Sequence, residues 1–317
     1  MSIRVLLKKI RKYLQSLKWR IYVYPSFSII LKNQLTWLFS RKQCILIDGY
    51  LVDFYHNPPK YQNWGDALNV YLFEKITGKK IIPVKTLLFN KFLTRYSIIG
   101  STIPSYITNK TIIWGSGVMT LDKPLCTHKH THKPLAVYAV RGPLTRSYLL
   151  KNNIDCPEIY GDPALLLPRV YQPNKIKRHK IGLIPHHRDY DVANVDIYLW
   201  KNDDDIILID VAHYGNCFFE VIDRICSCDI ILSSSLHGLI VADAYGIKNK
   251  FCEFEYHHPN YDKYQDYYMS VGREFEKPIS VDNALHNIDA ILESDYTVSI
   301  DLGKMINVCP FNIKKYE

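Results

Sequence analysis

The body of the chain, from Cys44 onward, alternates between short apolar runs and segments in which apolar residues recur every three or four positions. Short runs of β-branched and aliphatic residues are typical of buried strands, and the longer period is typical of helices. Alternating strands and helices predict parallel sheets in an α/β fold. The predicted strands span residues 45–47, 51–55, 96–99, 111–114, 135–140, 180–184, 206–211, 229–232 and 250–254, and the predicted helices span 66–77, 143–151, 218–226 and 239–245.

A polar stretch interrupts this alternation. Residues 171–179 contain a proline and four basic groups, which indicates a linker, and the strand–helix pattern then starts again. Two such series predict two Rossmann-like lobes, residues 43–170 and 180–300, that face a cleft. Residues 301–317 are interpreted as a C-terminal tail. Ligands of parallel sheets lie beyond the carboxyl ends of the strands, so the functional residues are expected there.

The first 42 residues differ from the body in charge. They carry ten basic residues and no acidic one, so the rest of the chain is nearly neutral although the net charge is +9. On a helix, residues 1–21 place apolar side chains on one face and basic side chains on the other. Charges interrupt the apolar residues too often for a secretory signal or a bilayer span. We therefore predict that residues 1–42 bind an anionic membrane surface through a basic amphipathic helix; the alternative is a helix that packs on its own body.

The neutral body argues against a nucleic-acid partner, because such proteins carry basic stripes on the folded surface. The eight cysteines contain no Cys-x-x-Cys pair, and several lie in apolar runs, which is typical of reduced thiols in a cytoplasmic protein. Cys226 and Cys228 have the wrong spacing for structural zinc. His128, His130 and His132 would share one side of an extended strand, but a solvated loop is the preferred interpretation, and no metal is expected. The expected location is the inner face of the cytoplasmic membrane.

Two polar segments lie at strand-to-helix junctions of the first lobe. Asn63-Trp64-Gly65-Asp66 precedes a helix, where glycine permits close approach of the backbone and free amides attract anions. Asp66 is expected either to cap that helix or to act as a base. Gly115-Ser116-Gly117 follows a buried strand and is either an anion-binding loop or a plain turn.

Three further segments carry candidate chemistry. Arg141 ends a strand and is placed to bind a carboxylate or phosphate, with a surface salt bridge as the alternative. Ser233-Ser234-Ser235-Leu236-His237-Gly238 joins a strand to a helix and offers hydroxyls, a helix N-terminus and a histidine suited to proton transfer near neutral pH. A histidine that merely caps its own helix is the alternative for His237. His186 follows the strand that opens the second lobe. The serines lack a G-x-S-x-G elbow, so a hydrolase triad is not supported.

The order of these motifs resembles the polysaccharide pyruvyl transferase family. The resemblance covers residues 45–275 and rests on Asn-x-Gly-Asp at 63–66, Arg-Gly-Pro-x-Thr at 141–145, Gly-Asp-Pro-Ala at 161–164, Ser-Ser-x-Leu-His-Gly-x-x-x-Ala-Asp-Ala-x-Gly at 233–246 and Asp-Tyr-Tyr-x-Ser-x-Gly at 266–272. It implies a GT-B-like fold and phosphoenolpyruvate as donor, with no further cofactor. The implied product is a pyruvate ketal on a hydroxyl pair of a galactose-type sugar in a bacterial capsule or exopolysaccharide.

The resemblance also implies roles for single residues. Family members carry the donor on arginines and a histidine, and Arg141 and His237 match such positions. Some members have arginine where this chain has Ser235, so another cation, such as Arg273, Arg188 or Lys248, is expected to complete the phosphate site.

On this interpretation His237 is the general acid, Asp66 or Asp162 is the base, and Arg141 anchors the donor. The candidate substrate-binding residues are Asn63, Gly65, Gly115, Ser116, Gly117, Ser233, Ser234, Ser235, Leu236, Gly238, His186 and Arg273. The expected acceptor is a lipid-linked or polysaccharide sugar. Two alternatives stay open: a GT-B glycosyltransferase that uses a nucleotide sugar on a lipid-linked acceptor, and a non-enzymatic membrane-associated scaffold, against which the motifs at strand ends argue.

Overall fold

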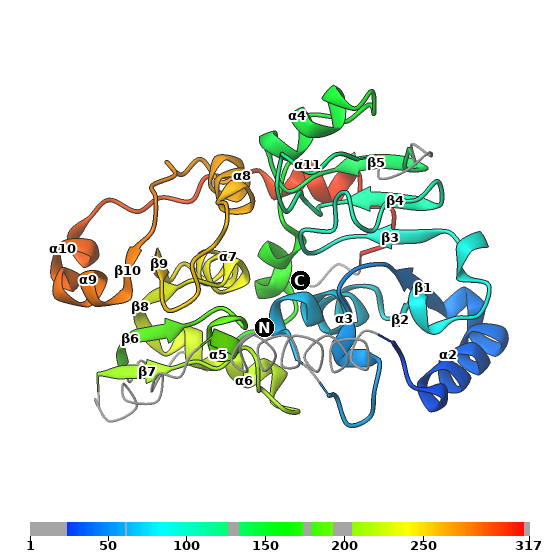
Figure 1. The fold of residues 1–317 in the computed structure, drawn as a ribbon, viewed down its shortest axis with the longest axis horizontal. Helices are drawn as coiled ribbons and strands as arrows, with labels where there is room; N and C mark the ends of the chain where they lie inside the picture. Colours follow the sequence, from blue (N-terminus) through cyan, green and yellow to red (C-terminus); the bar gives the residue numbers. More distant parts are fainter. Residues whose placement is uncertain (1–23, 61, 126–132, 174–178, 193–204, 314–317) are drawn as a thin grey trace, which may run out of the picture.

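The computed structural model describes residues 24–60, 62–125, 133–173, 179–192 and 205–313. The predicted basic helix over residues 1–21 and the histidines at 128, 130 and 132 therefore lie outside the described residues. Within the described residues the chain forms two separate sheets with helices packed around them (Figure 1), and every strand pair in both sheets is parallel. This confirms the predicted α/β class.

The first sheet has five strands in the order β2-β1-β3-β4-β5. Two of its interior strands, β1 and β4, are short and mostly apolar, which suits a sheet covered on both faces. The strands are β1 (Cys44–Ile47), β2 (Lys80–Pro83), β3 (Arg95–Ser97), β4 (Thr111–Trp114) and β5 (Ala136–Ala139), and the accompanying helices are α2 (Phe27–Ser40), α3 (Trp64–Thr77) and α4 (Pro143–Lys151).

The second sheet has five strands in the order β10-β9-β8-β6-β7. The strands are β6 (His179–Ile184), β7 (Ile206–Leu208), β8 (Cys228–Ser233), β9 (Lys248–Glu253) and β10 (Ile279–Ser280). The helices are α5 (Asp189–Val192), α6 (Phe218–Cys226), α7 (Leu236–Ala244), α8 (Asp262–Ser270), α9 (Val281–His286) and α10 (Ile288–Glu293). Among the described helices, none is both long and apolar enough to cross a bilayer.

The two sheets are joined by one continuous apolar core. The 3₁₀ segment Pro163–Arg169 packs against α7, and its apolar residues are fully enclosed. The indole of Trp64 in α3 donates to the carbonyl of Phe218 in α6 over 2.9 Å. These contacts hold the N-terminal ends of α3 and α7 against each other, which is what positions the site.

Residues 301–313, which belong to the segment interpreted as a C-terminal tail, return to the first sheet. Helix α11 (Leu302–Asn307) lies beside β4 and β5 in Figure 1. The indole of Trp114 donates to the carbonyl of Met305 over 2.9 Å, and the ring of Phe311 packs on Phe73 and Tyr96. Met305 is thereby buried in the first lobe, and Leu302, Ile306 and Phe311 are partly buried against it.

Several predicted bounds differ from the structure by one to three residues, and one predicted strand is a 3₁₀ helix. Residues 51–55 are not a strand: Val52–Phe54 form a 3₁₀ helix, and an apolar run this short carries no period that separates the two. Helix α7 begins at Leu236, three residues earlier than predicted, because Ser235 takes the extended N-cap conformation. His237 is therefore inside the first turn of the helix.

Candidate functional site

A cavity of about 360 Å³ lies between the two sheets. Its walls come from segments that follow the carboxyl ends of strands in both sheets, where ligands of parallel sheets bind. Its volume falls at the lower end of the range of about 300–1,000 Å³ typical of small-molecule sites. The lining residues are Tyr50, Asn63, Asp66, Ser101, Thr102, Ser105, Tyr106, Met119, Lys123, His186, His187, Arg188, Ser235, Leu236, His237 and Lys263.

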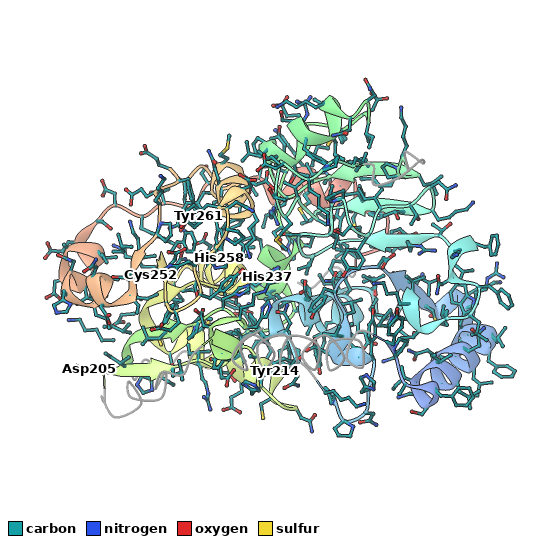
Figure 2. All side chains as sticks on the ribbon, in the orientation of Figure 1. Asp205, Tyr214, His237, Cys252, His258 and Tyr261 are labelled. Atoms are coloured by element: carbon teal, nitrogen blue, oxygen red, sulfur yellow. The ribbon has the colours of Figure 1, made fainter. Side chains whose placement is uncertain are left out.

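His237 lies near the middle of the molecule, between the two sheets (Figure 2). Its Nε2 is 4.0 Å from Oδ2 of Asp162, and neither atom has a hydrogen-bond partner. That separation is too long for a hydrogen bond, so these two atoms form an unsatisfied pair. Burial, followed by the charges of Arg141 and Lys263, lowers the pKa of His237 to about 3, while burial raises the pKa of Asp162 to about 6. Without a ligand, His237 is a neutral imidazole at pH 7.

Gly65 makes room for this histidine. A Cβ placed on Gly65 would lie 2.3 Å from Nδ1 of His237. The group that closely approaches this glycine at the start of α3 is therefore the imidazole of α7.

Asp66 faces the same cavity from the first turn of α3. Its Oδ2 accepts a hydrogen bond from Nδ2 of Asn63 over 2.6 Å. Burial, followed by the charge of Asp53, raises the pKa of Asp66 to about 8. Asp66 therefore holds a proton at neutral pH. Of the two groups, the Asp66 carboxyl is protonated and the His237 imidazole is neutral.

Lys263 is the residue that the sequence analysis missed. It lies in α8, is only 8% exposed, and lines the cavity. No carboxylate of the described residues lies within ion-pair distance of its Nζ, which sits 4.9 Å from the ring centre of Tyr264. Burial, followed by the charge of Arg141, lowers the pKa of Lys263 to about 7. A buried ammonium without a counter-ion is costly, and an anionic ligand would remove that cost.

Arg141 lies behind the cavity wall. It is fully buried, donates from Nε to Oδ2 of Asp266 over 3.1 Å and from Nη2 to the carbonyl of Val118 over 2.7 Å. Its Nη1 donates to Oγ of Ser101, which lines the cavity. A Cβ on Gly117 would lie 2.4 Å from its guanidinium carbon, so this glycine accommodates Arg141. Arg141 thus acts on the cavity through its charge and through Ser101.

The three serines at 233–235 have different positions relative to the cavity. Ser235 and Leu236 line the cavity, whereas Ser233 and Ser234 are fully buried. Oγ of Ser233 donates to the carbonyl of Ile184 over 3.0 Å, and Oγ of Ser234 donates to Oδ2 of Asp189 over 2.8 Å. A Cβ on Gly238 would lie 2.6 Å from Oγ of Ser233, so that glycine also serves packing.

Three histidines form one side of the cavity and its support. His186 and His187 line it, and His258 packs edge-on against His186. Burial lowers the pKa of His186 well below its usual value, and it lowers the pKa of His187 and of His258 to about 3. These rings are therefore neutral hydrogen-bonding groups at pH 7.

Cations also lie at the mouth of the cavity. Arg188 is exposed and donates from Nη1 to the hydroxyl of Tyr256 over 2.8 Å, and Nζ of Lys123 donates to Oγ of Ser105 over 2.9 Å. Of the three cations expected to complete a phosphate site, Arg188 alone lines this cavity.

The glycine–serine loop after β4 supports the wall without lining it. Oγ of Ser116 is 2.8 Å from Oγ of Ser97 and accepts from Thr102, which lines the cavity. Gly115 has a φ of +96°, and a Cβ there would lie 2.4 Å from Pro163. Here the plain-turn interpretation describes the geometry.

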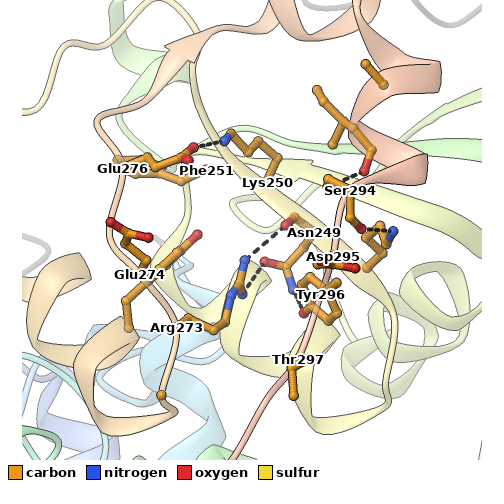
Figure 3. Close-up of a pocket in the computed structure, with 15 residues that line it drawn as sticks. Asn249, Lys250, Phe251, Arg273, Glu274, Glu276, Ser294, Asp295, Tyr296 and Thr297 are labelled. Carbon is orange, nitrogen blue, oxygen red and sulfur yellow. Dashed lines mark hydrogen bonds and ion pairs between the residues drawn. The ribbon is translucent and has the colours of Figure 1, made fainter.

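Arg273 lies in a different pocket, which residues 248–251 of β9 also line (Figure 3). Its Nη1 donates to Oδ1 of Asp243 over 2.9 Å and to Oδ1 of Asn249 over 3.0 Å, and its guanidinium lies between the rings of Tyr268 and Tyr296. Lys248 lies in the same pocket and donates to the carbonyl of Ser294. The structure does not bring these two cations to His237.

Among the described residues, no cluster of three or more His, Cys, Asp or Glu side chains has the arrangement of a metal site.

Two parallel sheets whose strand ends enclose a cavity lined by a buried, unpaired lysine define an α/β protein with a candidate small-molecule site. The model of the family described as polysaccharide pyruvyl transferase matches residues 44–249, and the chain belongs to this family. Over 228 residues the chain is 28% identical to "Uncharacterized protein L143" of Acanthamoeba polyphaga mimivirus. The aligned segment covers 70% of this chain and 75% of that protein. No solved structure matches the chain, so the GT-B-like arrangement stays a prediction.

Proposed function

We propose that the chain transfers the enolpyruvyl-derived group of phosphoenolpyruvate to a hydroxyl pair of a galactose-type sugar, forming a pyruvate ketal during surface polysaccharide synthesis. The family supports transfer to a polysaccharide in general. The observation that carries the choice of donor is Lys263, a buried ammonium without a carboxylate partner among the described residues, in a cavity that also holds a protonated Asp66.

Phosphoenolpyruvate carries a phosphate and a carboxylate, so its site needs at least two cationic anchors. Lys263 supplies one from the floor of the cavity, and Arg188 and Lys123 supply others at its mouth. The neutral rings of His186 and His187 add hydrogen bonds without adding charge. Lys263 thus takes the place expected of an arginine at Ser235, and it reaches the cavity from α8.

The reaction requires one proton to be given to carbon and others to be removed from oxygen. In this proposal the Asp66 carboxyl protonates the methylene carbon of the donor, which becomes a methyl group and leaves an oxocarbenium at C2. One sugar hydroxyl attacks C2 and loses its proton, the C2–O bond to phosphate breaks, and the second hydroxyl closes the ketal. Of the two hydroxyl protons, one replaces the proton given by Asp66 and the other leaves with inorganic phosphate.

His237 is the candidate group to receive the hydroxyl proton, with the Asp162 carboxylate beside it. It is neutral at pH 7, lines the cavity, and becomes an imidazolium 4.0 Å from the Asp162 carboxylate when it accepts a proton. These roles reverse the expectation that His237 is the acid and Asp66 the base, because burial acts in opposite directions on a carboxyl and an imidazole.

The test is release of inorganic phosphate from phosphoenolpyruvate, measured with simple and lipid-linked galactosides as acceptors. We expect phosphate release that depends on acceptor, with loss of about 10²- to 10⁴-fold in His237→Ala, the range typical of proton-transfer groups. A loss below about threefold would remove His237 from the mechanism. Release of a nucleotide from nucleotide sugars would support a glycosyltransferase, and neither product with a broad acceptor panel would favour a scaffold.

Lys263→Met and Lys248→Met form a matched pair for the donor site. Lys248 is one of the three sequence-based candidates for the missing cation, but it lies in the other pocket. The proposal requires the KM for phosphoenolpyruvate to rise at least tenfold in Lys263→Met and to change little in Lys248→Met. Equal effects would contradict it.

A further inference from the structure

Helix α2 has its apolar stripe turned toward solvent. Phe27, Leu31, Leu35 and Leu38 follow helical spacing along one face, and each is between 45% and 78% exposed. No residue of the helix is fully buried. A helix on a protein surface ordinarily turns such a stripe toward the core, so this orientation needs an explanation.

The opposite face of α2 is attached to the body partly through polar groups. Nδ2 of Asn33 donates to Oγ1 of Thr86 over 2.9 Å, and Oε1 of Gln34 accepts from the backbone amide of Leu88 over 3.0 Å. Trp37 packs on the apolar cluster beside β2. The orientation of the helix is thus fixed by specific contacts.

The segment that follows Thr86 extends the exposed apolar area. Leu88, Phe89 and Phe92 are 55%, 81% and 76% exposed. Phe89 has a φ of +54°, a strained conformation for a bulky residue, which places a large aromatic group at the tip of a loop. Tyr24, α2 (which also carries the exposed Phe39) and this loop hold nine of the fifteen large apolar side chains that are exposed in the described part of the chain. We call this area the α2 surface.

The charge around the α2 surface has one sign. Lys32, Arg41, Lys42 and Lys91 are exposed on α2, just beyond its end and on the loop. Residues 24–47 and 84–94 contain no aspartate or glutamate. In Figure 1, α2 lies at the end of the molecule that is opposite the second sheet.

We propose that the α2 surface docks on an anionic lipid bilayer, with Phe89 and Phe92 inserted at the headgroup level. Aromatic side chains favour that level, and basic residues beside them favour anionic lipids. A second copy of the chain fits less well, because a two-fold interface would oppose the same basic residues with no acidic residue between them. This inference assigns part of the membrane binding expected of residues 1–42 to α2, adds the loop of residues 84–94 to it, and is independent of the proposed reaction.

The experiment uses the full chain and sedimentation with vesicles of equal parts phosphatidylglycerol and phosphatidylcholine. The variant Phe89→Asn with Phe92→Ser removes both aromatic groups, and asparagine accepts a positive φ, so the fold is not strained. The matched control is Leu135→Ser with Leu150→Ser, which removes two exposed apolar side chains elsewhere on the first lobe. We expect the aromatic variant to bind vesicles at least about tenfold more weakly, the loss for one buried aromatic side chain, and the control to bind like the wild type.

Three results would overturn the proposal. The first is equal vesicle binding by the aromatic variant and the wild type. The second is a wild-type dimer in sedimentation velocity that the aromatic variant lacks, which would assign the surface to a second copy. The third is hydrogen exchange in residues 86–93 that is slow already and unchanged by vesicles, because the surface would then be covered by the protein itself. Phosphate release with a water-soluble acceptor should stay unchanged in both variants, which separates this test from that of the proposed function.

Discussion

The guanidinium of Arg141 and the carboxylate of Asp266 form an ion pair in which both side chains are completely buried. Asp266 also accepts from the backbone amide and the hydroxyl of Thr145, over 2.9 and 2.6 Å. The pair joins the end of β5 in the first lobe to α8 in the second, the helix that carries Lys263. It therefore couples the relative position of the two lobes to the position of the buried ammonium.

Removing one partner of this pair should be strongly destabilising. Asp266→Asn leaves the Arg141 charge buried and uncompensated, which typically costs about 3–5 kcal/mol of unfolding free energy. The measurement is urea unfolding followed by circular dichroism. Asp289→Asn is the control, because the Lys180–Asp289 pair is exposed and is expected to change stability by less than about 1 kcal/mol. Similar effects of the two substitutions would contradict the structural role assigned to Arg141.

Several elements could be predicted because their signals are local. The first turn of α4 is marked by Pro143, and α6 and α4 have the predicted bounds. The convergence of Asp66 and His237 followed from topology, since the strand ends of each sheet share one edge. The periodicity of the apolar residues, and the rule that parallel strands end at the same edge of a sheet, are sufficient for these predictions.

Lys263 could not be predicted from such signals, because a lysine on a tyrosine-rich helix is ordinarily a surface residue. The available signal was spacing: Lys263, Asp266, Tyr267 and Ser270 share one helical face, and that face is buried in the structure. The burial of Arg141 against Asp266, and the separation of Arg273 from the cavity, depend on contacts between residues more than twenty positions apart. Sequence spacing carries no information about such partners.

Gly65→Ala should impair catalysis without an equal loss of stability. The new Cβ would lie 2.3 Å from Nδ1 of His237, so the imidazole has to shift from its position 4.0 Å from the Asp162 carboxylate. We expect kcat to fall by about tenfold or more, because a small displacement of a proton-transfer group is costly. In the double variant with His237→Ala, the Gly65→Ala substitution should have little additional effect. Additive losses would show that Gly65 acts on something other than His237.

Asp66→Asn should lower kcat by about 10²- to 10⁴-fold, because the amide cannot give a proton to carbon. The raised pKa of about 8 means that Asp66 holds its proton below that pH, so wild-type kcat/KM, which already falls above about pH 7 as Lys263 loses its charge, should fall more steeply as pH rises through about 8. Asp53→Asn is the informative control. Asp53 does not line the cavity, but its charge is the second cause of the raised pKa of Asp66. Its removal should move the alkaline limb to lower pH and leave the maximal rate nearly unchanged.

Donor binding should depend on pH through Lys263. The pKa of this ammonium is lowered to about 7, so the free protein loses the charge as pH rises above that value. A bound dianion favours the charged form, and binding above pH 7 then takes up a proton. By linkage, the Kd for phosphoenolpyruvate should rise by up to about tenfold per pH unit above about pH 7.

Two substitutions of Lys263 separate charge from structure. Lys263→Arg keeps its charge at all accessible pH values, so donor binding should become nearly independent of pH in the alkaline range. Lys263→Met should bind phosphoenolpyruvate weakly at every pH, and its Kd should no longer rise with pH above about pH 7. Calorimetric titration of the protein with phosphoenolpyruvate, in buffers of different ionisation enthalpy, reports both Kd and the number of protons taken up. If the wild type and Lys263→Arg show the same slope, the proton resides on another group, and Lys263 is then a buried cation that the donor does not contact.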